Sequence, residues 1–174
     1  MNVPVIRTAR LVLRGHSRED FPAFAAMRAD PAVMRFIGKG EVLAEEDAWL
    51  RFLSTIGHWE LLGYGTWAVE EKATARLIGG IGYADKRRPA EHPASGAPEM
   101  GWSFASDLHG RGFATEALQA ALAWGAQHFG PTRAVCVISD DNAASLRLAE
   151  RHGFRRFARA SRHGLGRIVF ERML

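Results

Sequence analysis

A glycine turn, His109-Gly110-Arg111-Gly112, separates a strand-like segment from a helix-like one. Residues 99–104 are predicted to form a strand, and small residues at helical spacing predict a helix over about 112–129. A helix N-terminus carries N–H groups without intrahelical partners and the positive end of the helix dipole. Because glycines let such N–H groups converge on one anion, this turn is predicted to bind phosphate through its main chain.

Phosphate binding is not the only interpretation that this turn allows. Taken alone, a G-x-G turn is also typical of a purely structural bend. The third glycine of a dinucleotide fingerprint is missing, and no Gly-Lys-Ser/Thr follows as it does in a P-loop. The turn alone therefore does not identify its ligand, and the other segments of the sequence are needed to do so.

The pattern of the remaining chain predicts a mixed α/β fold around one sheet. Strands are expected over 10–14, 66–70, 77–83, 134–138, 154–161 and 167–173, and helices between Ser17 and Asp30, over 44–56 and from about 142 to 153. Glycines at 79, 80 and 82 indicate a bulge or a close approach by another element. Residues 86–98 contain three prolines and are expected to be an irregular loop, either a ligand contact or a plain connector.

Composition narrows the class of protein. With 174 residues, 47% apolar and 24% charged, residues 1–174 are expected to form a single globular domain. The lone Cys136 lies in an apolar run and is expected to be a core thiol. A cytoplasmic location is expected, because the sequence shows no signal peptide and no membrane span. The net charge of +4 is compatible with anionic ligands; nucleic acid is not expected as a partner, and the histidine spacing predicts no metal site.

Several segments together resemble one known family. The segment Gly110-Arg111-Gly112-Phe113-Ala114-Thr115-Glu116-Ala117 resembles the acetyl-CoA pyrophosphate loop of the GNAT acetyltransferases. The start at 7–14, Pro98-Glu99-Met100-Gly101-Trp102, Asn142-Ala143-Ala144-Ser145 and Glu150-Arg151-His152-Gly153-Phe154 agree in order and spacing. The chain looks most like the ribosomal-protein (RimJ/RimL-like) N-acetyltransferase branch. This resemblance implies a mostly antiparallel central sheet with helices on both faces and strands that splay apart at a cofactor cleft.

The resemblance also implies which residues bind acetyl-CoA. Main-chain groups of Trp102, Ser103 and Phe104 would pair with the pantetheine arm. Asn142 would contact the pantetheine or its ordered water, in addition to acting as a helix cap. The pyrophosphate would be held by N–H groups of His109, Gly110, Arg111, Gly112, Phe113, Ala114 and Thr115. Asp107 stands where many relatives have Gln or Arg, which removes one anion contact.

Amine attack on a thioester needs a neutral amine, a stabilised oxyanion and a leaving thiolate. Glu99, at the start of the strand before the turn, is the candidate base, with a surface strand-end charge as the alternative. The family's usual tyrosine acid falls at Ala149 and is therefore absent. Ser145, one helical turn from Asn142, resembles the serine that this branch uses near the thiol; a small packing residue is the alternative.

The expected acceptor is a primary amine, either a protein N-terminal α-amine or a small molecule. His58 and Trp59 are the candidate acceptor-pocket residues, whereas Trp49 and Trp67 are expected in the core. The absent tyrosine motivates a second hypothesis, a catalytically inactive CoA-binding regulatory module. A homodimer is left open.

Overall fold

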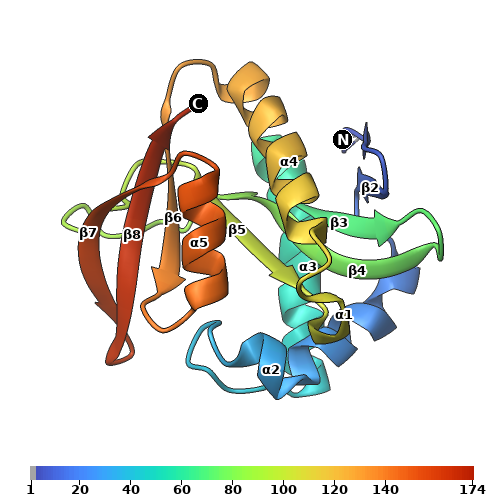
Figure 1. Cartoon of the computed structure of the whole chain (residues 1–174). Coiled ribbons are helices and arrows are strands. Elements are labelled where there is room, and N and C mark those ends of the chain that lie inside the picture. Colours follow the sequence, from blue (N-terminus) through green and yellow to red (C-terminus); the bar gives the residue numbers. More distant parts are fainter. Residues whose placement is uncertain (1–2) are drawn as a thin grey trace.

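A computed structural model describes residues 3–174 and confirms a mixed α/β fold around one sheet (Figure 1). Eight strands lie in the order β1-β2-β3-β4-β5-β6-β8-β7. The strands are β1 (Ile6–Arg7), β2 (Leu11–Arg14), β3 (Thr66–Glu71), β4 (Arg76–Ala84), β5 (Glu99–Phe104), β6 (Arg133–Ser139), β7 (Arg155–Arg162) and β8 (Leu165–Met173). The only parallel neighbours among these described strands are β5 and β6; every other pair is antiparallel.

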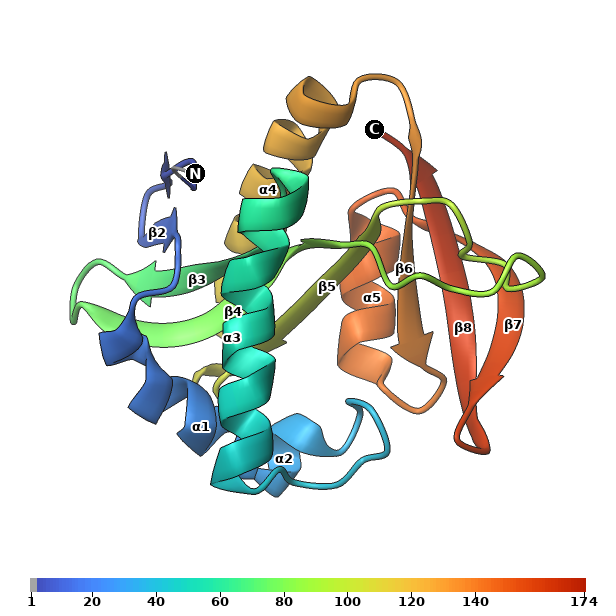
Figure 2. The same cartoon turned by 180° about the vertical axis from the view of Figure 1, so that it is seen from behind.

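Helices cover both faces of the sheet, as expected. On one face lie α1 (Phe21–Ala29), α2 (Pro31–Met34) and α3 (Glu45–Leu62), and on the other lie α4 (Phe113–Phe129) and α5 (Ala143–Arg151) (Figures 1 and 2). Short 3-10 helices span Arg18–Asp20 and Ser106–Leu108. No helix in the described chain has the length and apolarity needed to cross a membrane.

The strands β5 and β6 splay apart, and this opens the sheet. They share a single register pair, Glu99 with Val135, whereas β5 pairs with β4 along its whole length. Beyond Glu99 the two strands diverge, so the side of β5 that faces β6 has no strand against it (Figure 1). The two halves of the sheet share this register pair, and one buried apolar cluster contains residues of both halves and of α4.

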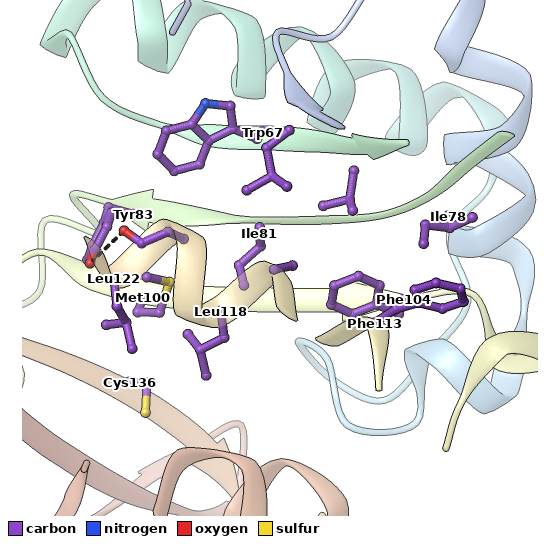
Figure 3. Close-up of a cluster of buried hydrophobic side chains, with 14 of the residues drawn as sticks. Trp67, Ile78, Ile81, Tyr83, Met100, Phe104, Phe113, Leu118, Leu122 and Cys136 are labelled. Carbon is purple, nitrogen blue, oxygen red and sulfur yellow. Dashed lines mark hydrogen bonds between the residues drawn. The ribbon is translucent and has the colours of Figure 1, made fainter. Parts of the chain in front are cut away.

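Close packing fixes α4 on β4 and β5 (Figure 3). Leu118 and Leu122 of α4 lie near Met100 of β5, and all three are at most 8% exposed. The Tyr83 ring lies against α4 where Gly125 leaves room for it, and its hydroxyl donates to Ala121 O at 3.4 Å. This contact sets how far α4, and hence its N-terminal turn, lies from the sheet.

Two helix assignments differ from the sequence expectation. The helix expected over 44–56 continues to Leu62, because Trp59 extends its apolar face and Gly63, at φ 73°, ends it by donating to Trp59 O. The short α2 was not predicted; Asp30 caps it through Ala32 N–H at 2.8 Å, and Pro31 starts it. The glycine-rich β4 is a close approach, as expected: a Cβ on Gly82 would lie 2.0 Å from Gly65 O.

Candidate active site

The splayed strands border a cleft of about 570 Å³. Its lining comes from β5, the turn before α4, β6 and one face of α5, and from α2 and Arg51 of α3; the loop at 86–88 and Arg167 of β8 complete it. Most of the predicted cofactor residues line it: Trp102, Ser103, Phe104, His109, Gly110, Gly112, Phe113, Ala114, Thr115 and Asn142. Glu99 and Ser145 line the same cleft, so the fold brings together residues from three separate sequence segments.

The turn before α4 presents free main-chain donors. Gly110 and Gly112 both have φ 78°, a left-handed conformation that favours glycine. Within the described chain, the N–H groups of residues 110–115 donate no internal hydrogen bond, and the first helical bond is from Glu116 N–H to Gly112 O at 3.2 Å. A Cβ on Gly110 would meet nothing within 4 Å, which leaves open space beside these donors. The geometry is that of an anion site.

The turn also corrects one of the sequence expectations, the one for the N–H of His109. The N–H of His109 bonds to Ser106 O at 3.3 Å, so it is not one of the free donors. Its ring instead lies with Nε2 3.1 Å from Phe104 O. The side chain of Arg111 lies outside the cleft lining, with its guanidinium over the Phe113 ring and 3.7 Å from Glu71, whereas its main-chain N–H remains one of the free donors. The free donors therefore begin at Gly110.

The N-terminal segment braces the turn from outside. Glu116, in the first turn of α4, accepts hydrogen bonds from Thr8 Oγ1 at 2.6 Å and from Arg10 N at 2.7 Å. Arg10 Nε pairs with the same carboxylate, and its Nη1 donates to Arg111 O at 2.9 Å. These contacts hold the pKa of Glu116 below its usual value against the opposing effect of burial. These contacts give Thr8 and Arg10 a physical role. In the sequence the segment 7–14 resembled the family, but its role could not be inferred.

Main-chain groups of β5 alternate between β4 and the opening. Ala105 N–H bonds to Ile78 O at 2.9 Å, and in an antiparallel ladder this makes the Ser103 and Gly80 pair a hydrogen-bonded one. Ser103 therefore directs its main chain toward β4, contrary to the expectation that it pairs with a ligand. The main-chain groups of Trp102 and Phe104 face the opening.

Ser145 and Asn142 lie at the start of α5. Asn142 Oδ1 accepts from Ser145 N–H at 3.1 Å, which confirms Asn142 as the helix cap. Ser145 Oγ accepts from the indole Nε1 of Trp102, also at 3.1 Å. Because the indole occupies an acceptor site of the hydroxyl, the Ser145 proton remains available to a group in the cleft. Residue 149, where the family's tyrosine acid would stand, is an alanine that is fully buried in the core, so this position supplies no acid.

Glu99 lies at the narrow end of the opening. Its two oxygens accept from Arg88 Nε and Nη2 at 2.8 and 2.9 Å, and its side chain is only 11% exposed. It is therefore a largely enclosed, oriented carboxylate rather than a freely exposed surface charge. No sequence signal pointed to Arg88, which lies 11 positions before Glu99 in the loop expected to be irregular.

His58 and Trp59 lie away from the cleft. Trp59 is 3% exposed, packs on Trp67 with ring centroids 4.8 Å apart, and donates from Nε1 to Thr66 O. His58 bridges Tyr64 O and Asp85 N–H with its two ring nitrogens. Both side chains secure the end of α3 to the sheet, and neither lines the cleft. Their placement corrects the expectation that they form an acceptor pocket.

Cys136 and Asp107 have mainly structural surroundings. Cys136 is 1% exposed, and burial raises the pKa of its thiol well above the usual value, so it is a core residue as expected. Asp107 forms a two-point ion pair with Arg76 at 2.7 and 3.2 Å at the edge of the turn. Both oxygens of its carboxylate therefore bind Arg76, the first residue of β4.

Comparison with known proteins identifies the family. Residues 10–155 match the family model described as acetyltransferase (GNAT) domain. The Bacillus subtilis protein named uncharacterized N-acetyltransferase YoaA is 30% identical over 158 residues, covering 88% of this chain and 84% of the relative. A GNAT-family acetyltransferase structure from Bordetella pertussis is 34% identical with a TM-score of 0.84, covering 97% of this chain and 99% of that one.

The fold is also shared with a protein solved with a ligand. RimL, a ribosomal L7/L12 alpha-N-protein acetyltransferase in complex with coenzyme A, superposes with a TM-score of 0.80 over 98% of both chains, at 18% identity. At that identity the likeness concerns the fold. The family match and the closer relatives carry the assignment: this chain belongs to the GNAT acetyltransferase family and is an acyltransferase.

Proposed function

We propose that this protein transfers the acetyl group of acetyl-CoA to a primary amine by direct attack. The observation that carries the proposal is the row of free N–H groups at residues 110–115, next to a strand whose main chain faces an opening. The N–H groups suit a diphosphate. The main-chain groups of Trp102 and the N–H of Phe104, which face the opening, suit an extended amide-bearing arm, which coenzyme A carries.

The other cleft residues have roles consistent with this reaction. The amine nitrogen forms a bond to the thioester carbonyl carbon, and the carbon–sulfur bond then breaks. Ser145 Oγ donates a hydrogen bond to the departing thiolate, with Trp102 holding the hydroxyl in place. Asn142 contacts the arm while it caps α5.

Glu99 receives the amine proton through water. Each of its carboxylate oxygens has a lone pair left after binding Arg88, and one of these can accept a hydrogen bond from water. At pH 7, freeing an α-amine of pKa about 8 costs about 1.4 kcal/mol, whereas freeing a lysine of pKa about 10.4 costs about 4.6 kcal/mol. A base that works through water therefore suits an α-amine better than a lysine.

Thiol release from acetyl-CoA tests the proposal against a panel of peptides with free N-termini, lysine-bearing peptides with blocked N-termini and small amines. We expect acetyl-CoA-dependent release with at least one α-amine. Calorimetric binding of acetyl-CoA without turnover on any amine would instead support the inactive CoA-binding module. The absence of both binding and turnover would reject both.

A further inference from the structure

One arginine near the cleft has a buried guanidinium nitrogen and no anionic partner among the described residues. Arg28, at the end of α1, has no carboxylate within 4.0 Å among the described residues, and its Nε is buried without a hydrogen-bond partner. Its guanidinium lies over the Phe24 ring at 4.7 Å, and its two terminal nitrogens contact Ser103 Oγ at 3.3 Å and Met34 Sδ at 4.0 Å. A hydroxyl and a thioether compensate a buried charge poorly, since buried cations are normally paired.

A second arginine increases the unbalanced charge. Arg51 of α3 lines the cleft, and its positive charge acts on Arg28. Burial, with the repulsion from Arg51, lowers the pKa of Arg28 to about 10. Two like charges that act on each other in this way are destabilising, and an anion bound by both would relieve the cost.

The charge balance of the cleft supports the same conclusion. Six Arg or Lys side chains line it, against a single acidic one among the described residues, Glu99, whose oxygens both bind Arg88. No acid of the cleft wall is therefore placed to neutralise Arg28 and Arg51.

These arginines are on the opposite face of the sheet from the glycine turn. Successive side chains of a strand point to opposite faces: Trp102 points to α5, where it meets Ser145, and Ser103 points to α1, where it meets Arg28. Figure 2 shows α1 and α3 covering that second face, with α4 behind the sheet. The proposed diphosphate site at α4 is thus separated from Arg28 by β5, so the phosphates of the acetyl donor do not account for this charge.

We propose that Arg28 and Arg51 form a carboxylate subsite for the acceptor, so that the preferred acceptor is a primary amine that also carries a carboxylate. This inference rests on the proposed function. A planar carboxylate matches the unused N–H donors of a guanidinium in two-point geometry. Ser103, which already contacts Arg28, connects this subsite to the strand that borders the opening. Two sources have this chemistry: the α-carboxylate of a free amino acid, and an acidic side chain near a peptide N-terminus.

Matched acceptor pairs test the proposal and separate the sources. One arm compares an amino acid with its amide, and the other compares Ser-Asp-Phe with Ser-Asn-Phe peptides. The amine of an amino acid amide is less basic than that of the free amino acid, so more of it is unprotonated at neutral pH. A preference for the acid therefore cannot result from a larger fraction of neutral amine. We expect kcat/KM to favour the carboxylate member at least about tenfold in one arm, as expected for a hydrogen bond to a charged group; the arm identifies the source.

Variants connect the preference to the two arginines. Arg51→Gln and Arg28→Met should each reduce the carboxylate preference about tenfold. Arg18→Gln is the matched control, because it removes the same charge at an exposed position outside the cleft and should leave the preference unchanged. If Arg28→Met unfolds, Arg51→Gln alone decides, since Arg51 is exposed on α3. Equal kcat/KM within every pair, or an unaltered preference in Arg51→Gln, would overturn the subsite.

A binding measurement distinguishes failure of the subsite from failure of the proposed function. Calorimetry of the N-acetylated acid and of its amide, each titrated into the protein with coenzyme A, needs no turnover. Tighter binding of the acid that is lost in Arg51→Gln supports the subsite even when no amine is acetylated, a result that would overturn only the proposed reaction. Acetylation of neutral amines with no acid preference in either assay would overturn only the subsite.

Discussion

Replacing Gly125 with alanine should destabilise the protein, although the same change in a helix usually stabilises it. Alanine is favoured over glycine by about 1 kcal/mol in a helix interior. At 125, however, the added Cβ would lie 2.1 Å from Tyr83 Oη and 2.6 Å from Cζ. The Tyr83 ring is fully buried and cannot swing away, so either the ring or α4 has to move.

The expected cost follows from these contacts. Overpacking a core typically costs about 1–3 kcal/mol, and displacing Tyr83 also loses its bond to Ala121 O, worth about 0.5–1.5 kcal/mol. After the propensity gain is subtracted, we expect a net loss of about 2 kcal/mol, or a fall in Tm of about 4–8 °C for a chain of this size.

Gly57 provides the matched control in α3. It is a helix-interior glycine whose added Cβ would meet nothing within 4 Å. Gly57→Ala should therefore raise the free energy of unfolding by about 0.5–1 kcal/mol. Urea unfolding followed by circular dichroism measures both variants. If Gly125→Ala is as stable as wild type, or gains stability as Gly57→Ala does, the argument that Tyr83 sets the position of α4 is wrong.

Three further predictions concern the cleft and the core. Glu99→Gln should slow turnover more on lysine than on α-amine acceptors, because lysine depends more on a base; an unchanged rate on both would remove Glu99 from the mechanism. Ser145→Ala should lower kcat about tenfold or more while KM for acetyl-CoA changes little, because it removes a hydrogen bond to a charged leaving group. Trp102→Phe should give a smaller loss of kcat in the same steady-state assay. A full rate in Ser145→Ala would exclude the leaving-group role. Burial lowers the pKa of His16, whose side chain is 2% exposed beside Asp20, to about 4. The free energy of unfolding should therefore fall by about 2 kcal/mol between pH 7.5 and 5.0, because the unfolded state takes up a proton there and the folded state does not. His16→Phe should remove that share of the pH dependence in urea unfolding, and an undiminished loss in this variant would show that another group is responsible.

Local sequence signals were sufficient for the elements that form the turn. The strand before it and α4 after it occur where the pattern predicted them, because glycine conformation and helical spacing are properties of neighbouring residues. The end of α3 was misjudged because Gly57 and His58 interrupt the apolar spacing. Packing of Trp59 on Trp67 and Trp124 extends the helix all the same.

The site was only partly predictable, because its side-chain partners are distant in sequence. Arg28 meets Ser103 across 75 positions, and nothing in either local segment encodes that contact. A signal for Arg28 did exist: it lies four positions after Phe24 and one after Met27, on the buried face of α1, where a cation is unusual. The prediction that His58 and Trp59 form an acceptor pocket was wrong, because both side chains have partners that secure α3 to the sheet.

Calorimetric titration of coenzyme A into wild type, Gly110→Val and Gly164→Val tests the central claim most directly. Both glycines have positive φ, 78° and 74°, and open space around an added Cβ, so backbone strain is matched and only the position differs. We predict that coenzyme A binds wild type and Gly164→Val with similar affinity and binds Gly110→Val at least about 100-fold more weakly, because the added side chain fills the space beside the free N–H groups. Equal affinity for Gly110→Val, or no binding to wild type, would contradict the account.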